Sequence, residues 1–372
     1  MRSKLRVWAI GSTIALVGMG VFLAVRDLSK RSILLPPVFP KVACGPHCRM
    51  ITTRLNFVAV QPYEFHFSGR HMVSRAFSPS PKIANYVDLD TAEEYDAVAD
   101  PPEAGIESAW VQTLMGEDCM TKQFNGTKGS KRQSSIYRLC MHHQGQKLLV
   151  SAQEDLGQMG SDDRYLVIGE GSKLFTVDTA DGSRHLIANS FYYVTNVSVV
   201  NPYIILPEAD EEIHLIDVRD WSDTNVSSDP ALQYMAASDG KRIVWVDYRY
   251  SLSHSVPEIV VYGIASKEIT RITFSEERPS NKFHPTIEGD WIAWNDDRDS
   301  CAPNSSIDTP RDRLDVYGYN LATKKEYHLV GNRAGEIEHF YPLLPRLHRG
   351  KLYVVGRSPQ NRQLFEFTLP ML

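Results

Sequence analysis

Acidic residues beside arginine, at the ends of apolar segments, are the residues of this sequence best suited to chemistry. The clearest run covers residues 295–299 (NDDRD), and Asp247 with Arg249 forms a shorter version. Clustered carboxylates can bind calcium, but calcium takes six or more oxygen ligands and this spacing is not that of an EF-hand loop. Acid and arginine at a strand end more often pair or cap a turn. We therefore interpret both runs as structural, keep calcium as the less favoured alternative, and predict no other cofactor.

No catalytic motif accompanies these residues. Gly-x-Ser-x-Gly, phosphate-loop and His-Glu-x-x-His patterns are absent from the sequence. The adjacent pair His142 and His143 would point to opposite faces of a strand and could not bind one metal together. A Ser-His-Asp triad is defined by geometry and not by chain order, but the sequence nominates no such set. An enzyme is therefore the less favoured interpretation.

The acidic and arginine residues belong to a sequence pattern that occurs twice between residues 232 and 331. Each copy has a turn, a short apolar strand that ends in acid and arginine, and two further strands. The matched residues are Trp245, Asp247 and Arg249 in the first copy, and Trp294, Asp296 and Arg298 in the second. Because these residues recur with the architecture, we assign them to packing between neighbouring repeats. A repeated unit that cannot bury its faces alone predicts a stacked or radial all-β array.

Weaker copies extend the pattern along residues 51–372. Six turns each precede an apolar strand, at Gly69, Asp163, Asn201, Gly240, Gly289 and Gly350. A less clear unit at residues 100–155 carries a basic, Gly/Ser-rich insertion at 125–135, which we expect to be a solvated loop. Units of about 40 residues with about four strands are typical of β-propeller blades. The sequence predicts an all-β propeller of seven blades, or six without the weak unit.

The last unit is too short for a full blade. Residues 51–60 are expected to supply its missing strand and so close the ring, which removes an exposed sheet edge. A pair of β-sandwiches is the structural alternative, but it leaves the regular repeat unexplained.

The strings RIVWVDYR at residues 242–249 and DWIAWNDDR at residues 290–298 resemble the TolB-like β-propeller repeats of bacterial envelope and surface proteins. The match is good over residues 232–331 and only architectural elsewhere. The resemblance implies an extracytoplasmic propeller that binds proteins or other ligands and is not catalytic. The family has no fixed catalytic residues to carry over. This chain departs from the family in its predicted membrane anchor and in two long blade insertions.

A hydrophobic segment near the start predicts membrane attachment. Three basic residues precede an uncharged run at residues 7–25. At about 1.5 Å per residue, this run nearly matches the roughly 30 Å hydrocarbon core. Residues 1–26 are predicted to be an uncleaved signal anchor because the small-residue cleavage pattern is poor, with a cleaved signal peptide as the alternative. The prolines within residues 27–50 predict a stiff spacer between the membrane and the propeller domain at residues 51–372.

Cysteine usage indicates an oxidising compartment, so the propeller is expected on the periplasmic or extracellular side. The chain offers two plausible disulfides, Cys44 with Cys48 and Cys119 with Cys140. A zinc site at Cys44, His47 and Cys48 lacks a clear fourth ligand and is less favoured than a disulfide or free thiols.

The sequence therefore predicts a membrane-anchored scaffold or protein-interaction module, which includes an accessory subunit of a membrane complex. The net charge of −5 argues against a nucleic-acid partner. Unmatched aromatic residues are the candidates for an exposed contact face, namely Tyr192, Tyr193 and Trp221. The alternative is a propeller hydrolase or lyase that acts on glycans or peptides in the central channel. Carboxylates and histidines lining that channel would favour the enzyme.

Overall fold

The computed structural model describes residues 48–52, 65–74, 76–78, 85–96, 106–114, 119–128, 131–140, 143–154, 156–189, 197–207, 212–251, 256–276, 279–298, 314–331, 341–357 and 362–370. The predicted anchor at residues 1–26 and nearly all of the predicted spacer at 27–50 lie outside this set. Within the described ranges, no helix has the length and hydrophobicity needed to cross a membrane.

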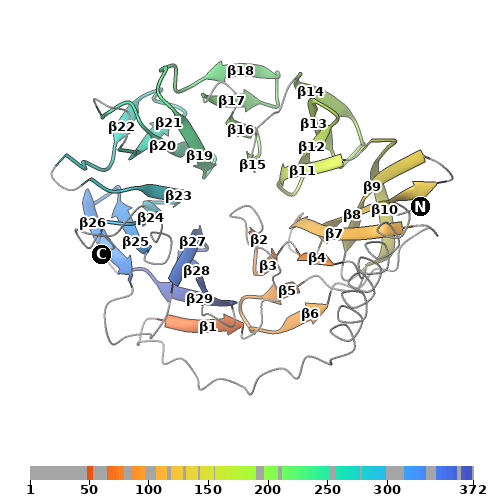
Figure 1. Cartoon of the computed structure of the whole chain (residues 1–372), viewed down its shortest axis with the longest axis horizontal. Coiled ribbons are helices and arrows are strands. Elements are labelled where there is room, and N and C mark those ends of the chain that lie inside the picture. Colours follow the sequence, from red (N-terminus) through yellow and green to blue (C-terminus); the bar gives the residue numbers. More distant parts are fainter. Residues whose placement is uncertain are drawn as a thin grey trace, which may run out of the picture. The chain divides into compact units, whose positions relative to one another are not determined.

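Seven antiparallel sheets stand around a common axis as the blades of a propeller (Figure 1). The prediction of an all-β, seven-bladed propeller is thereby confirmed, and the weak unit at residues 100–155 is a blade. Blade 1 contains β2 (Phe65–Ser68), β3 (His71–Ser74), β5 (Asn85–Asp88) and β6 (Glu94–Asp96). Blade 2 contains β7 (Ile106–Leu114), β8 (Cys119–Lys128), β9 (Lys131–Cys140) and β10 (His143–Ala152), with β4 (Ala76–Ser78) paired to β7 as a fifth strand.

Blades 3 to 6 are four-stranded meanders in which each strand pairs with the next along the chain. Blade 3 contains β11 (Leu156–Ser161), β12 (Tyr165–Glu170), β13 (Lys173–Asp178) and β14 (Arg184–Ala188). Blade 4 contains β15 (Ser198–Val200), β16 (Tyr203–Pro207), β17 (Ile213–Asp217) and β18 (Ser222–Asn225). Blade 5 contains β19 (Gln233–Ser238), β20 (Arg242–Asp247), β21 (Glu258–Gly263) and β22 (Ile269–Arg271). Blade 6 contains β23 (Lys282–Glu288), β24 (Trp291–Asp296), β25 (Asp315–Asn320) and β26 (Lys325–Val330).

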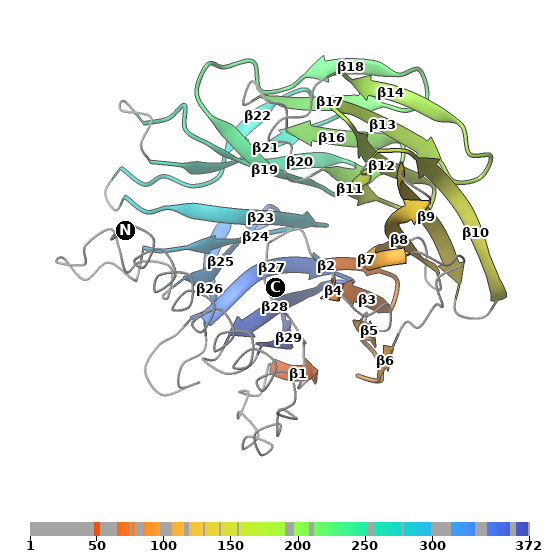
Figure 2. The ribbon, with the colours of Figure 1, turned by 45° about the vertical axis from the view of Figure 1, so that its right-hand side comes forward.

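Blade 7 closes the ring by combining the two ends of the described chain. Its sheet runs β27 (Tyr341–His348), β28 (Lys351–Arg357), β29 (Arg362–Thr368) and then β1 (Cys48–Thr52). Residues 51–60 were expected to supply this strand; the strand instead begins at Cys48, and residues 53–60 lie outside the described set. Cys48 is opposite Phe367 and Thr52 is opposite Leu364 in the antiparallel register. Figure 2 shows β1 lying along β29.

The second strand of blades 3 to 7 is largely buried on both faces, which explains its nearly continuous apolar sequence. In β20, Ile243 and Trp245 pack with Ile205 of blade 4. The alternate residues of β20, represented by Val244, pack with Trp294 of blade 6. Successive side chains of a strand point to opposite faces, so one strand serves two interfaces between blades.

The described part of residues 125–135 is not the solvated loop that its Gly, Ser and Lys content suggested. Residues 125–128 belong to β8 and residues 131–135 to β9, and the two strands pair from Cys119–Cys140 at one end to Lys128–Lys131 at the other. Polar side chains hold this hairpin together and join it to the next blade. Ser134 donates to the Asn125 side chain at 2.6 Å within the hairpin, and Gln123 donates to the Leu156 carbonyl of β11 at 2.6 Å. The satisfied polar groups explain how a hydrophilic sequence forms strands here.

Candidate functional site

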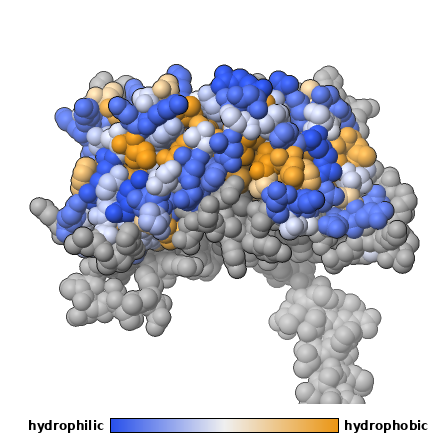
Figure 3. Space-filling model, turned by 90° about the horizontal axis from the view of Figure 1, so that it is seen from above, coloured by the Kyte–Doolittle hydropathy of each residue, from blue (hydrophilic) through white to orange (hydrophobic). Residues whose placement is uncertain are grey.

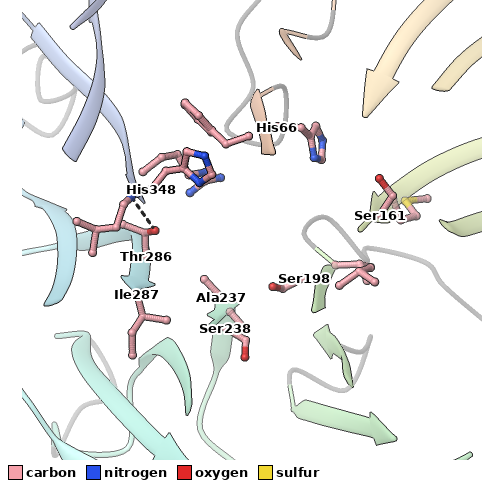
Figure 4. Close-up of a pocket in the computed structure, with 15 residues that line it drawn as sticks. His66, Ser161, Ser198, Ala237, Ser238, Thr286, Ile287 and His348 are labelled. Carbon is pink, nitrogen blue, oxygen red and sulfur yellow. Dashed lines mark hydrogen bonds between the residues drawn. The ribbon is translucent and has the colours of Figure 1, made fainter. Parts of the chain in front are cut away.

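A cavity of about 230 Å³ lies among the inner strands of the ring (Figure 4). Six blades contribute lining residues, from β2, β11, β19, β23, β27 and the start of β15. The basic lining residues are His66, Arg346 and His348, and the hydroxyl-bearing ones are Ser161, Ser198, Ser238 and Thr286. None of the described residues that line the cavity is acidic. We call this cavity the channel pocket.

A bulge in the inner strand recurs in three consecutive blades and sets which side chains face the pocket. Met235, His284 and Leu344 have φ angles of 57°, 51° and 54°, and each sits where the strand register shifts. Residues other than glycine seldom adopt this backbone conformation, and a bulge redirects the side chains around it. Two residues after each bulge residue, Ala237, Thr286 and Arg346 line the channel pocket.

Hydrogen bonds connect the bulged strand of blade 7 to two strands of blade 6, β23 and β24. The backbone N–H of Leu344 donates to the Asn295 side chain at 3.2 Å, and the N–H of Leu347 donates to the Thr286 hydroxyl at 3.2 Å. On the opposite side, β11 approaches the residues before β15 so closely that a Cβ at Gly160 would collide with the carbonyl of Val197. The pocket walls are therefore fixed by contacts between blades that involve the backbone and short polar side chains.

Arg346 supplies a fixed positive charge at the pocket. Burial lowers the pKa of its guanidinium to about 10, so the group is still charged at neutral pH. Burial also lowers the pKa of His284 to about 4, helped by the charge of Arg346 and opposed by a hydrogen bond with Asn295. His284 is therefore neutral at pH 7, and its Nδ1 is buried without a hydrogen-bond partner among the described residues.

His348 is neutral and already hydrogen-bonded. Its Nε2 donates to the Gly69 carbonyl at 2.6 Å, across the boundary between blades 7 and 1. Burial lowers the pKa of this imidazole, although the bond to Gly69 opposes the shift. The ring also packs beside Phe67, with centroids 5.4 Å apart. In Figure 4, His66 and His348 lie at the edge of the same open space.

No metal site is found in the described part of the chain, where no three His, Cys, Asp or Glu side chains are close enough to hold an ion together. The acidic runs considered for calcium have other partners: Asp297, for example, accepts from the backbone and side chain of Asn281 at 2.7 Å.

The six repeat residues lie at the ends of β20 and β24, away from the channel pocket. Each tryptophan donates its indole N–H to the acid two residues later, and each arginine contacts the same acid: Trp245, Asp247 and Arg249 in blade 5, and Trp294, Asp296 and Arg298 in blade 6. Burial disfavours ionisation of Asp296, but its hydrogen bond with Arg298 and the charge of Lys282 still hold the pKa of this carboxyl below its usual value.

The predicted contact residue Trp221 lies in the turn between β17 and β18. Its ring stacks on that of His185, with centroids 3.8 Å apart and planes 8° apart, and packs against the core between blades 3 and 4. Trp221 is therefore half-buried, while Tyr192 and Tyr193 lie outside the described residues.

Large exposed apolar side chains in the described ranges are scattered over blades 2, 3 and 5 rather than gathered in one blade: Leu148, Leu186, Leu232 and Phe274. The face shown in Figure 3 is accordingly mostly hydrophilic, with smaller hydrophobic areas between.

The predicted disulfide between Cys119 and Cys140 is confirmed, and it joins β8 to β9 at their paired ends. Cys48 is also disulfide-bonded, and its predicted partner Cys44 lies outside the described residues.

The sequence did not single out the channel pocket. Arg346 and His348 are two residues apart on β27, but His66 lies about 280 residues earlier, and no local spacing links them. The available signal was a pair of basic residues at alternate positions in an otherwise apolar strand. Such a pair places both side chains on one face of the strand.

Comparison with known proteins supports the fold. No family model and no curated protein matches the chain. Among solved structures, an oligogalacturonate lyase in complex with manganese is similar, with a TM-score of 0.55, 12% identity, and coverage of 88% of this chain and 95% of that one. The β-propeller domain of the trilobed protease from Pyrococcus furiosus has a TM-score of 0.54 at 11% identity, covering 82% of this chain and 94% of that domain.

The TolB-like resemblance implied a propeller, and the seven sheets have that architecture. A protein described as TolB from Agrobacterium tumefaciens has a TM-score of 0.39 at 17% identity, covering 62% of this chain and 79% of that one. The chain is a β-propeller. At these identities, the similarities extend no further than the fold.

Proposed function

We propose that this protein is a binding module, anchored to a membrane by residues 1–26, that takes its ligand into the channel pocket. The observation that carries the proposal is the chemistry of the pocket wall. Its described residues offer one fixed positive charge and several hydroxyl groups but no acid. Hydrolysis of a glycosidic bond ordinarily uses two carboxyl groups, and the described wall offers none. Binding therefore suits this wall better than hydrolysis.

The proposed location outside the cytoplasm has two supports. The uncharged run at residues 7–25 follows three basic residues, and the disulfide between Cys119 and Cys140 suits an oxidising compartment. A rigid propeller at a membrane surface would act as a scaffold or as an accessory subunit of a membrane complex, with a protein partner that reaches the channel pocket.

A lyase is the second candidate, supported by a specific likeness. An oligogalacturonate lyase shares the fold over most of both chains, and the channel pocket contains two imidazoles, from His66 and His348. Against it, the Nε2 of His348 is already bonded to the Gly69 carbonyl.

Blocking the pocket tests the proposal. The full chain is purified from detergent-solubilised membranes, with cross-linking, as wild type and as Ser198→Trp, which fills the pocket. Ser222→Trp is the matched control because Ser222 is exposed on β18 in the same blade. We expect the cross-linked partner to be lost from Ser198→Trp and kept in Ser222→Trp. The opposite outcome is a wild-type protein that purifies alone and cleaves oligogalacturonate to unsaturated products, with that activity lost in Ser198→Trp. This result would refute the binding module and support the lyase.

A further inference from the structure

We infer that the group held in the channel pocket is an oxyanion, a carboxylate or a phosphate, and that Arg346 is the residue that binds it. The inference rests on the proposed function in one respect, namely that the channel pocket is the ligand site.

The charge of the pocket selects an anion. Every ionisable residue in the described lining is basic, and His348 is held neutral, so Arg346 is the constant source of charge. A guanidinium presents a planar fork of N–H donors that matches two oxygens of a carboxylate or phosphate. A charge set among low-dielectric walls also acts more strongly on a ligand than the same charge on an open surface.

Hydroxyl donors are placed to complete such a site. The hydroxyl of Ser198 makes no side-chain hydrogen bond with the described residues, and Figure 4 shows Ser198 at the same open space as Thr286 and His348. The Thr286 oxygen accepts from the N–H of Leu347, which leaves the hydroxyl proton of Thr286 available to a ligand. Ser238, by contrast, donates to the Arg242 carbonyl at 2.8 Å and is occupied within its own turn.

The same residues disfavour a cation. The Nε2 of His348 already donates to the Gly69 carbonyl, so this nitrogen is not available to a metal ion. The charge of Arg346 in the pocket lining also disfavours a divalent cation there.

The size of the pocket indicates how much of a ligand enters. About 230 Å³ is below the roughly 300–1,000 Å³ of pockets that enclose a whole drug-sized ligand. The pocket therefore suits the acidic group and a few neighbouring atoms at the end or side of a longer ligand.

Saturation-transfer NMR on the full chain in detergent tests the inference with three methyl-bearing probes. Acetate represents a carboxylate, methylphosphonate represents a phosphate, and tetramethylammonium is the cationic control. We expect signals from one or both anions and none from the cation. A stronger acetate signal assigns the ligand group to a carboxylate, and a stronger methylphosphonate signal assigns it to a phosphate. Equal signals from all three probes overturn the inference.

Variants of Arg346 connect binding to the residue. Arg346→Gln should weaken anion binding about tenfold, and Arg346→Lys, which keeps the charge but not the fork, should weaken it less. Arg349→Gln is the matched control because Arg349 lies three residues away, is exposed and pairs with Asp90 at 2.9 Å. An unchanged affinity in a folded Arg346→Gln or Arg346→Lys protein overturns the inference.

The two proposals can fail separately. Suppose that anion binding depends on Arg346 but the cross-linked partner is still captured by Ser198→Trp. This result would refute only the proposal that the partner binds in the channel pocket. Loss of the partner in Ser198→Trp without any anion binding would refute only the oxyanion.

Discussion

The indole nitrogen of Trp245 donates a hydrogen bond to the Asp247 carboxylate at 2.8 Å, two residues further along the chain. In the next blade, Trp294 repeats this bond to Asp296 at 3.1 Å. Both carboxylates have fully buried side chains and a paired arginine. The repeated tryptophan, acid and arginine thus form one buried polar unit at the end of the second strand in each of these blades.

Removing the arginine from this unit should be costly. Arg249→Gln leaves the buried Asp247 charge without its ion pair, and we expect the free energy of unfolding to fall by about 3 kcal/mol. Arg219→Gln is the control because Arg219 also pairs with an acid two residues earlier but is 64% exposed. That change should cost clearly less, because solvent screens an exposed ion pair. Chemical unfolding of the two variants gives the comparison, and equal losses would contradict a special role for the buried unit.

Stability should decrease in mild acid because of His284. Its pKa is about 4 in the folded protein and about 6.5 when unfolded, so the unfolded chain binds more protons between these values. Stability is therefore full above pH 6.5 and falls as the pH drops toward 4, by about 3 kcal/mol from this residue. His284→Gln should flatten the curve over this window. Burial lowers the pKa of His348 as well, so some slope remains. Parallel curves for His284→Gln and wild type would refute the assignment.

The Cys119–Cys140 disulfide should stabilise blade 2. It links residues 21 apart, and closing a loop of this length contributes about 3 kcal/mol in the chain-entropy description. The double variant Cys119→Ser with Cys140→Ser should therefore have a lower thermal midpoint, and its β8–β9 hairpin should be cut sooner by protease. Cys301→Ser is the control, because Cys301 is the fifth cysteine of the chain and belongs to neither predicted disulfide. A double variant that melts with the control would show that the disulfide adds no stability.

Arg49 should stabilise the closure of the ring. Its guanidinium donates to the Asp90 carbonyl of blade 1 at 3.2 Å and pairs with Glu366 of β29 at 3.2 Å. Because the side chain is 45% exposed, Arg49→Gln should cost only about 1 kcal/mol overall. Hydrogen exchange should nevertheless accelerate in β1 and β29 while blades 3 to 6 keep their protection. Uniform acceleration would instead indicate a global effect.

The strands that the sequence revealed are those buried on both faces. In β20 and β24, consecutive residues face different neighbouring blades, so the strands appear as unbroken apolar runs with a tryptophan. The inner strands escaped detection because one face lines a channel and carries small or polar residues such as Ser198 and Ala237. Bulges at Met235 and its equivalents also break the alternation that identifies a strand.

The site was harder to predict than the fold. Arg346 and His66 line one pocket only because the ring closes, and nothing in the residues around either one indicates the other. The repeat that revealed the architecture also made Asp247 and Asp296 the first candidates for a functional site. Each accepts a hydrogen bond from a tryptophan indole, and neither lines the pocket.

Pairing of β1 with β29 imposes an order on biosynthesis. Arg49 and Glu366 are 317 residues apart, so the contact between them forms only when nearly the whole described chain has been made. Blades 3 to 6 each come from one contiguous segment and can fold as they emerge, whereas β1 appears first and must wait with an unpaired edge. Long-range pairing of this kind is slow and leaves intermediates prone to aggregation. A premature stop before β29 would therefore yield an open ring, a form that cellular quality control can distinguish from the finished propeller.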